Sequence, residues 1–110
     1  MVPPPLSLVP GTLDLLVLRV LASRPTHGYG VASAIAEHTG GDLVVEDAAL
    51  YQALHRLDAQ GLVAAEWSPS ENNRRARYYT LTPAGRRRLR HETANWRRYA
   101  RAVDAVLVRA

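Results

Sequence analysis

The hydrophobic period of this 110-residue chain changes in its second half, and that change restricts the fold more than any other feature. Residues 48–60 repeat leucine at the spacing of one helix face, and they are followed by Gly61, a residue type that commonly ends helices. Residues 62–67 and 76–82 alternate with a period of two, which is typical of strands. Residues 68–75 between them contain the proline, serine and asparagine of a turn. The pattern predicts a helix followed by a two-stranded hairpin.

Two shorter helices are predicted ahead of this point. Residues 11–24 have the length of a helix, with Thr12 in the N-cap position. Residues 29–38 form the second helix, which a pair of glycines closes. Between the second and third helices, residues 43–45 are a short β-prone run, and Asp47 can cap the third helix.

The first predicted helix is apolar on two opposite sides. Leu13 and Val17 share one face, whereas Leu15 and Leu18 lie nearly opposite at 100° per residue. A helix that is apolar all round must be covered on both sides, and a chain of this length has one modest core. The second face therefore suggests a partner subunit.

The last helix is predicted to start with Thr82 as N-cap and Pro83 as its first residue. Along it, residues recur in alternating steps of four and three, which is the spacing of a coiled-coil seam. The seam consists of Leu89, Thr93, Trp96, Ala100, Val103, Leu107 and Ala110. A helix this long cannot fold back over its whole length onto so small a domain. We therefore expect a homodimer, held by Leu15, Leu18, Leu89, Val103 and Leu107.

Three helices, a hairpin and a long helix make a mainly α, α+β fold of the winged helix-turn-helix type. In that arrangement the third helix lies in the major groove of DNA, and the hairpin, or wing, reaches the flanking backbone or the minor groove. The expected organisation is an N-terminal arm (residues 1–10), a DNA-binding domain (11–82) and a C-terminal dimerisation helix (83–110).

Positive charge is concentrated in the hairpin and the last helix. Residues 66–101 hold ten arginines and three carboxylates, whereas residues 1–65 hold three arginines and six carboxylates. A basic stripe confined to one third of a domain points to a polyanionic partner. The alternative is that these arginines form an ordinary solvated face.

Several classes of function lack the residues that they need. The chain has no cysteine, and its four histidines have no metal-ligand spacing. His27 is therefore expected to make a local hydrogen bond. No nucleophile motif, glycine-rich phosphate loop or supported carboxylate pair is present, so we expect neither an enzyme nor a cofactor. No apolar run is long enough to span a membrane, and no signal peptide is recognisable. A cytoplasmic, nucleoid-associated protein is expected.

Three stretches resemble the PadR family of bacterial transcriptional regulators: GTLDLLVLRVLASRPTHGYGVASAI, LYQALHRLDAQGLV and SENNRRARYYTLTPAGRRRL. The resemblance extends from Leu8 to the C-terminus and implies the short form of the family, with one C-terminal dimerisation helix. It implies a homodimeric repressor that binds a short inverted repeat in double-stranded DNA and can release it when a small molecule binds. Ala48 and Ala49 replace the usual glycine and hydroxyl residue, and Gln52 replaces a common proline.

Candidate DNA contacts lie on the third helix and the wing. The Tyr51 ring either packs against the core or places its hydroxyl on a phosphate. Gln52 can make a bidentate contact to adenine, and His55 and Arg56 are expected to share a base and a phosphate. The candidates on the wing are Asn73, Arg74, Arg75 and Arg77. Arg77 can instead lie over apolar strand surface.

Trp96 lies on the seam of the last helix. It is either a residue of the dimer core or, with its symmetry mate, a wall of a pocket between subunits that takes a small aromatic effector. The rival function is a winged-helix module for protein–protein contact without sequence-specific DNA binding, in which the basic wing meets an acidic partner.

Overall fold

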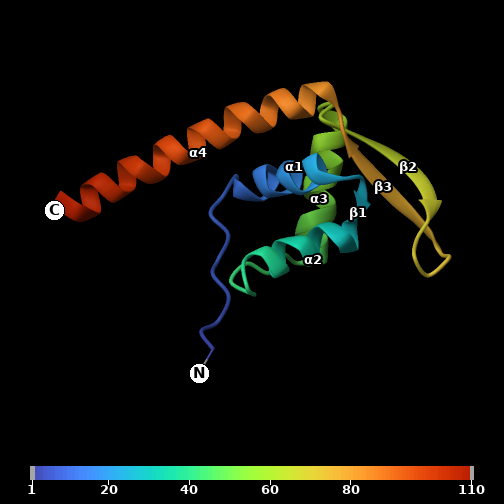
Figure 1. The fold of residues 1–110 in the computed structure, drawn as a ribbon, viewed down its shortest axis with the longest axis horizontal. Helices are drawn as coiled ribbons and strands as arrows, with labels where there is room; N and C mark the ends of the chain where they lie inside the picture. Colours follow the sequence, from blue (N-terminus) through green and yellow to red (C-terminus); the bar gives the residue numbers. More distant parts are fainter. Residues whose placement is uncertain (1, 110) are drawn as a thin grey trace.

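The computed structural model describes residues 2–109 and contains four helices and a small sheet (Figure 1). The order of elements predicted from the periodicity is confirmed, with one strand added. The helices are α1 (Thr12–Ser23), α2 (Gly28–His38), α3 (Asp47–Ala59) and α4 (Pro83–Arg109). The strands are β1 (Thr26–His27), β2 (Val63–Pro69) and β3 (Arg75–Leu81). None of the helices within residues 2–109 is long and apolar enough to cross a membrane.

The sheet has three antiparallel strands in the order β1-β3-β2, so the prediction of a two-stranded hairpin was incomplete. The added strand, β1, is only two residues long and pairs Thr26 with Tyr79 and His27 with Tyr78 of β3. Two residues are too few to show a period, and their pairing depends on β3, which lies far along the chain. The result is that β3 is central and the start of α2 is fixed to the wing.

The first helix occupies the centre of the domain, where α2, α3, α4 and β3 all contact it. Because these elements cover α1 on more than one side, the helix is apolar on opposite sides. Leu18 is only 1% exposed within the chain's own core, so the prediction that it faces a partner subunit was wrong. Leu15, by contrast, is half-buried and lines a hollow beside α4.

Three local predictions before α3 were also wrong. Gly11, with φ of 88°, is the N-cap of α1, while the Thr12 hydroxyl donates a hydrogen bond to the Val9 carbonyl at 2.6 Å. Asp47 is the first residue of α3, whose N-cap makes no side-chain hydrogen bond. The β-prone residues 43–45 form no strand, and the Leu43 amide donates to the Thr39 hydroxyl at 3.0 Å.

The start of α4 is fixed to the base of the wing, and its predicted cap is confirmed. The Thr82 hydroxyl accepts a hydrogen bond from the Gly85 amide at 3.0 Å and donates one to the Gly61 carbonyl at 2.7 Å. A Cβ at Gly85 would lie 2.1 Å from the Leu62 carbonyl oxygen, so this close approach requires glycine. The first turn of α4 therefore packs directly against the end of the loop that follows α3.

The far half of α4 stands clear of the other helices in Figure 1, and residues 101–109 are all exposed. Three of the predicted dimer contacts lie along this helix. Leu89 is half-buried against the core, whereas Val103 and Leu107 are exposed. The seam position at Ala110 lies outside the described residues.

Candidate nucleic-acid interface

One face of α3 is buried and the opposite face is open, which sets the side chains that can meet a partner. Leu50, Leu54 and Leu57 are all 1% exposed or less and anchor the helix in the core. Gln52 and His55 therefore point away from the core, and both are exposed. A polar face of this kind has the shape and chemistry to enter a major groove.

Arg56 lies on the same exposed side of α3 but is already paired. Its guanidinium donates to the Asp14 carboxylate of α1 at 2.7 Å. This hydrogen bond and the negative charge of Asp14 raise the pKa of Arg56. A phosphate contact by Arg56 would compete with this pair, whereas none of the side-chain hydrogen bonds within residues 2–109 involves Gln52 or His55.

A cleft of about 480 Å³ separates α3 from the wing and brings four predicted residues together. They are Tyr51, His55, Arg75 and Arg77. Gln52, Arg56, Asn73 and Arg74 do not line the cleft. Four residues that were not predicted to contact DNA also line the cleft: His27, Tyr29, Trp67 and Asn72. The aromatic rings of the first three are a signal of nucleic-acid binding, but only the fold shows that the four side chains converge.

Tyr51 has a half-exposed ring that lies against Gly28 at the start of α2. A Cβ at Gly28 would lie 3.2 Å from the Tyr51 Cε1 atom, so the absence of a side chain there makes room for the ring. The ring thus packs on one side and is open to the cleft on the other.

His27 fixes the start of α2 next to this ring. Its Nδ1 atom accepts a hydrogen bond from the Gly30 amide at 3.0 Å, which confirms the predicted local role. Its ring also meets Tyr78 edge-on, with centroids 5.2 Å apart. Within residues 2–109, no three His, Asp or Glu side chains lie close enough together to hold a metal ion.

Arg77 on β3 lies over strand surface, as one of its two predicted alternatives states, and its contact with DNA stays a prediction. Its guanidinium lies over the Tyr79 ring at 5.9 Å and contacts the Asp58 carboxylate at 3.4 Å. Burial raises the pKa of Tyr79, although the positive charge of Arg77 acts in the opposite direction. Arg77 therefore reaches the cleft with its charge partly compensated.

The wing tip is shorter than predicted, because β2 and β3 extend until Pro69 pairs with Arg75. The turn covers residues 70–74 and is closed by a hydrogen bond from the Ser70 amide to the Arg74 carbonyl at 2.7 Å. Asn73 has φ of 56°, a left-handed conformation that asparagine tolerates better than most residues. Asn73, Arg74 and Arg75 are all exposed at this end of the wing.

Residues 17–91 match the family described as "Transcriptional regulator PadR-like family". The chain belongs to that family. It is 33% identical to a transcriptional regulator of Mycobacterium tuberculosis, with 81% of this chain and 79% of the relative covered. A PadR-family regulator from Eggerthella lenta superposes with a TM-score of 0.78 at 34% identity, covering 91% of this chain and 85% of the other. A PadR-family regulator from Clostridium difficile gives 0.77 at 25% identity, covering 88% and 99%.

Membership in the PadR-like family confirms the resemblance carried by the three sequence stretches, and it confirms the winged-helix fold. The family is one of transcriptional regulators and not of enzymes. The cleft between α3 and the wing is therefore the candidate nucleic-acid interface of a PadR-like regulator.

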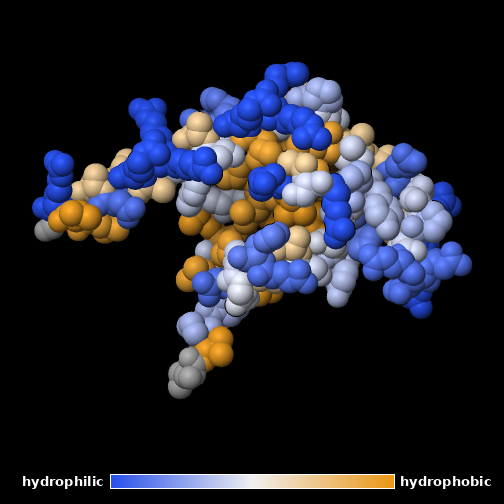
Figure 2. Space-filling model, viewed as in Figure 1, coloured by the Kyte–Doolittle hydropathy of each residue, from blue (hydrophilic) through white to orange (hydrophobic). Residues whose placement is uncertain are grey.

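A second surface of this PadR-like chain lies away from the wing, between α1 and α4. A hollow of about 740 Å³ is lined by Leu15, Leu16, Leu89 and Trp96 together with three arginines. Trp96 is 39% exposed, and its ring centroid lies 6.3 Å from that of Tyr99. Figure 2 shows hydrophobic side chains gathered in the centre of the molecule, below the hydrophilic side chains of α4.

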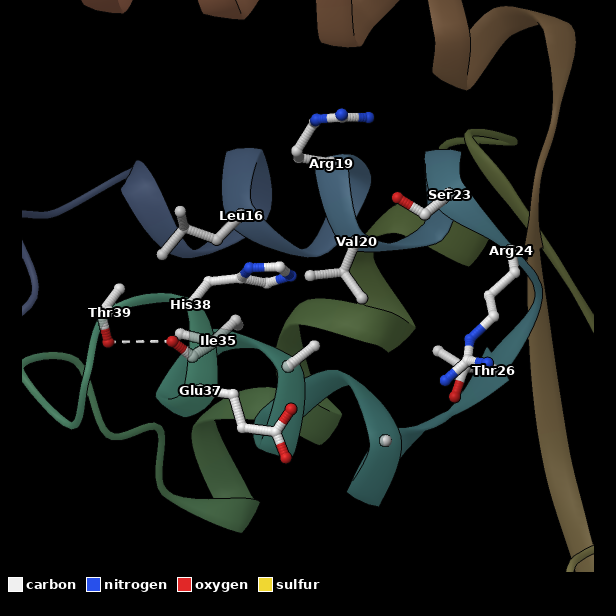
Figure 3. A pocket seen from close by; sticks show the side chains of 12 residues that line it. Leu16, Arg19, Val20, Ser23, Arg24, Thr26, Ile35, Glu37, His38 and Thr39 are labelled. Carbon is white, nitrogen blue, oxygen red and sulfur yellow. Dashed lines mark hydrogen bonds between the residues drawn. The ribbon is translucent and has the colours of Figure 1, made fainter.

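A neighbouring hollow of about 450 Å³ lies between α1 and α2, and Figure 3 shows how its side chains are arranged. Leu16, Val20 and Ile35 provide its apolar floor, while Arg19 and Glu37 stand at its rim. Leu16 and Arg19 line both hollows, so the two form one continuous surface across α1.

Proposed function

We propose that this PadR-like regulator acts as a homodimeric repressor that binds an inverted-repeat operator. The observation that carries the proposal is the cleft between α3 and the wing, in which aromatic, histidine and arginine side chains face one another. A duplex would place the exposed face of α3 in its major groove, and the wing arginines would meet the flanking backbone. The two sets of contacts have different roles, because contacts to base edges specify the sequence and contacts to phosphates position the protein.

Within α3, Gln52 is the proposed base reader and His55 the second contact. Gln52 is exposed, one turn into the helix, and its amide can donate to adenine N7 and accept from N6. Arg56 is the phosphate contact of this set, and binding would exchange its ion pair with Asp14 for a phosphate. Tyr51 supports this arrangement by presenting one side of its ring to the cleft.

On the wing, the proposed phosphate contacts are Asn73, Arg74, Arg75 and Arg77. Neither Arg74 nor Arg75 forms an ion pair within residues 2–109, so their charge is available to a polyanion. Arg77 is paired with Asp58 and is therefore expected to contribute less to phosphate binding than Arg74 and Arg75.

Dimer formation is proposed to use the surface across α1 and the far half of α4. Leu15 and Leu89 line the hollow between these helices, and Val103 and Leu107 extend the same seam along exposed helix. A partner's α4 would cover this apolar surface. In a two-fold dimer the two α3 helices would meet major grooves about 34 Å apart, which requires an inverted repeat.

Release by an effector is proposed to depend on Trp96. Its indole is partly exposed in a hollow large enough for a small aromatic molecule, and the symmetry mate would add the opposite wall. A ligand there would contact α1 and α4 of both subunits and so alter their packing.

Selection of bound duplexes from a random pool tests this function directly. The proposal expects enrichment of one inverted repeat whose half-sites lie one helical turn apart, and binding that survives excess random duplex. Recovery of no preferred sequence, together with binding to an acidic protein surface that ignores DNA, would replace it with a protein-interaction role.

A further inference from the structure

The wing carries a large aromatic side chain that the core does not explain. Trp67 of β2 is 54% exposed and is paired with Arg77 across the sheet. On the same face of β2, Val63 is buried and Ala65 is half-buried. This face thus continues from the core out to the cleft, and Trp67 lines the cleft opposite α3.

The Trp67 indole supports a wing arginine. The Arg75 guanidinium carbon lies 5.1 Å from the centroid of the indole ring. Arg75 pairs with Pro69 and is therefore a diagonal neighbour of Trp67 on one face of the hairpin, within reach for a long side chain. Both side chains line the cleft that also contains Tyr51 and His55. The stack holds the Arg75 charge on the side of the wing that faces α3.

Arg75 differs from the arginines on either side of it. Arg77 is stacked on Tyr79, but the Asp58 carboxylate compensates part of its charge. Arg74 forms part of the turn, and no aromatic ring within residues 2–109 lies beneath its guanidinium. Of the three, Arg75 alone combines an aromatic support with a charge that is not paired within the described residues.

We propose that Trp67 is a positioning residue for phosphate binding, and that its indole orients the Arg75 guanidinium toward the phosphodiester backbone of a duplex in the cleft. The inference rests on the proposed function. A long arginine side chain loses rotamer freedom when it binds, and ordering it beforehand reduces that loss. A cation–π contact at an exposed site favours the stacked orientation by about two- to fivefold, and affinity rises by up to the same factor because more of the guanidinium is already oriented for binding. Trp67 acts through Arg75 and reads no base.

A double-mutant cycle in the 110-residue chain tests this role. Duplex affinity is measured over a salt series for the unmodified chain, Trp67→Ala, Arg75→Ala and the double variant. Trp67→Ala is expected to weaken binding about two- to fivefold. Arg75→Ala is expected to remove one phosphate contact and lower the salt slope by about 0.9. In the Arg75→Ala background, Trp67→Ala is expected to cause no further weakening, because its partner is already absent.

Arg74→Ala provides the matched background, since Arg74 is a neighbouring arginine without the indole beneath it. Trp67→Ala should keep its full effect there, and Trp67→Tyr should restore part of the affinity because a ring remains. An equal effect of Trp67→Ala in the wild-type and Arg75→Ala backgrounds would overturn the inference while leaving DNA binding intact. Failure of the unmodified protein to bind any duplex would instead overturn the proposed function.

Discussion

Replacing Leu107 with alanine tests whether the exposed end of α4 belongs to the proposed dimer contact. The change removes three carbon atoms, worth about 2.4 kcal/mol when fully buried at about 0.8 kcal/mol each. Leu107 is 71% exposed in the single chain, so about 1.7 kcal/mol per subunit remains to be gained when a partner covers it. Two copies give about 3.4 kcal/mol, which corresponds to about a 300-fold rise in the dimer dissociation constant.

Sedimentation equilibrium over a concentration series measures this constant. Val108→Ala is the control, because Val108 is 84% exposed yet lies about 100° around the helix from the seam. Both changes preserve or improve helix propensity, so circular dichroism should show α4 intact. The reasoning is refuted if Leu107→Ala leaves the dissociation constant unchanged, or if Val108→Ala raises it by the same factor.

Three further predictions concern α3, the core and the hollow beside α4. Gln52→Ala should cost about 1–3 kcal/mol on the preferred operator and relax the preference at one base pair per half-site, and a panel of single-base operator variants would show an unchanged profile if Gln52 is not a reader. Leu18→Ala should lower the free energy of unfolding by about 2–5 kcal/mol in urea titrations, whereas a surface role at a dimer interface would leave it nearly unchanged at high dilution. In a Trp67→Phe background, planar aromatic compounds should quench Trp96 fluorescence and weaken operator binding together, because linkage is reciprocal. Quenching with unaltered operator affinity would leave Trp96 as a dimer-core residue.

The periodicity of the chain was sufficient to predict the order of helices and the wing, because long segments with one buried face repeat their pattern many times. The features that it missed are short or depend on distant residues. Strand β1 has two residues, and only pairing with Tyr78 and Tyr79 makes it a strand. Leu18 was assigned to a partner because the sequence shows that α1 is apolar all round but does not show how many elements of the same chain surround it.

The residues of the candidate site likewise include some that periodicity predicts and some that depend on contacts between distant parts of the chain. Exposure of Gln52 and His55 could be predicted from the leucine spacing on α3, since the register of one helix fixes both faces. The stack of Arg75 on Trp67 could not, because it depends on where the wing turn ends and hence on the register of β2 against β3. The pairing of Arg56 with Asp14 joins residues 42 positions apart and likewise requires the fold.

Because the start of α4 is attached to the base of the wing, the two are expected to move as one rigid body. The Thr82 amide donates to the Leu62 carbonyl at 3.1 Å, its hydroxyl joins Gly61 to Gly85, and the space for any side chain at Gly85 is filled. The helix cannot pivot at this point without breaking these contacts, so it turns together with the domain that carries α3. With 27 residues, α4 is a lever of about 40 Å, and a 10° rotation at one end displaces the other by about 7 Å. That displacement equals about two base-pair steps of B-DNA, so a rotation of this size between the two ends of α4 would be enough to move the halves of the proposed dimer out of phase with an inverted repeat.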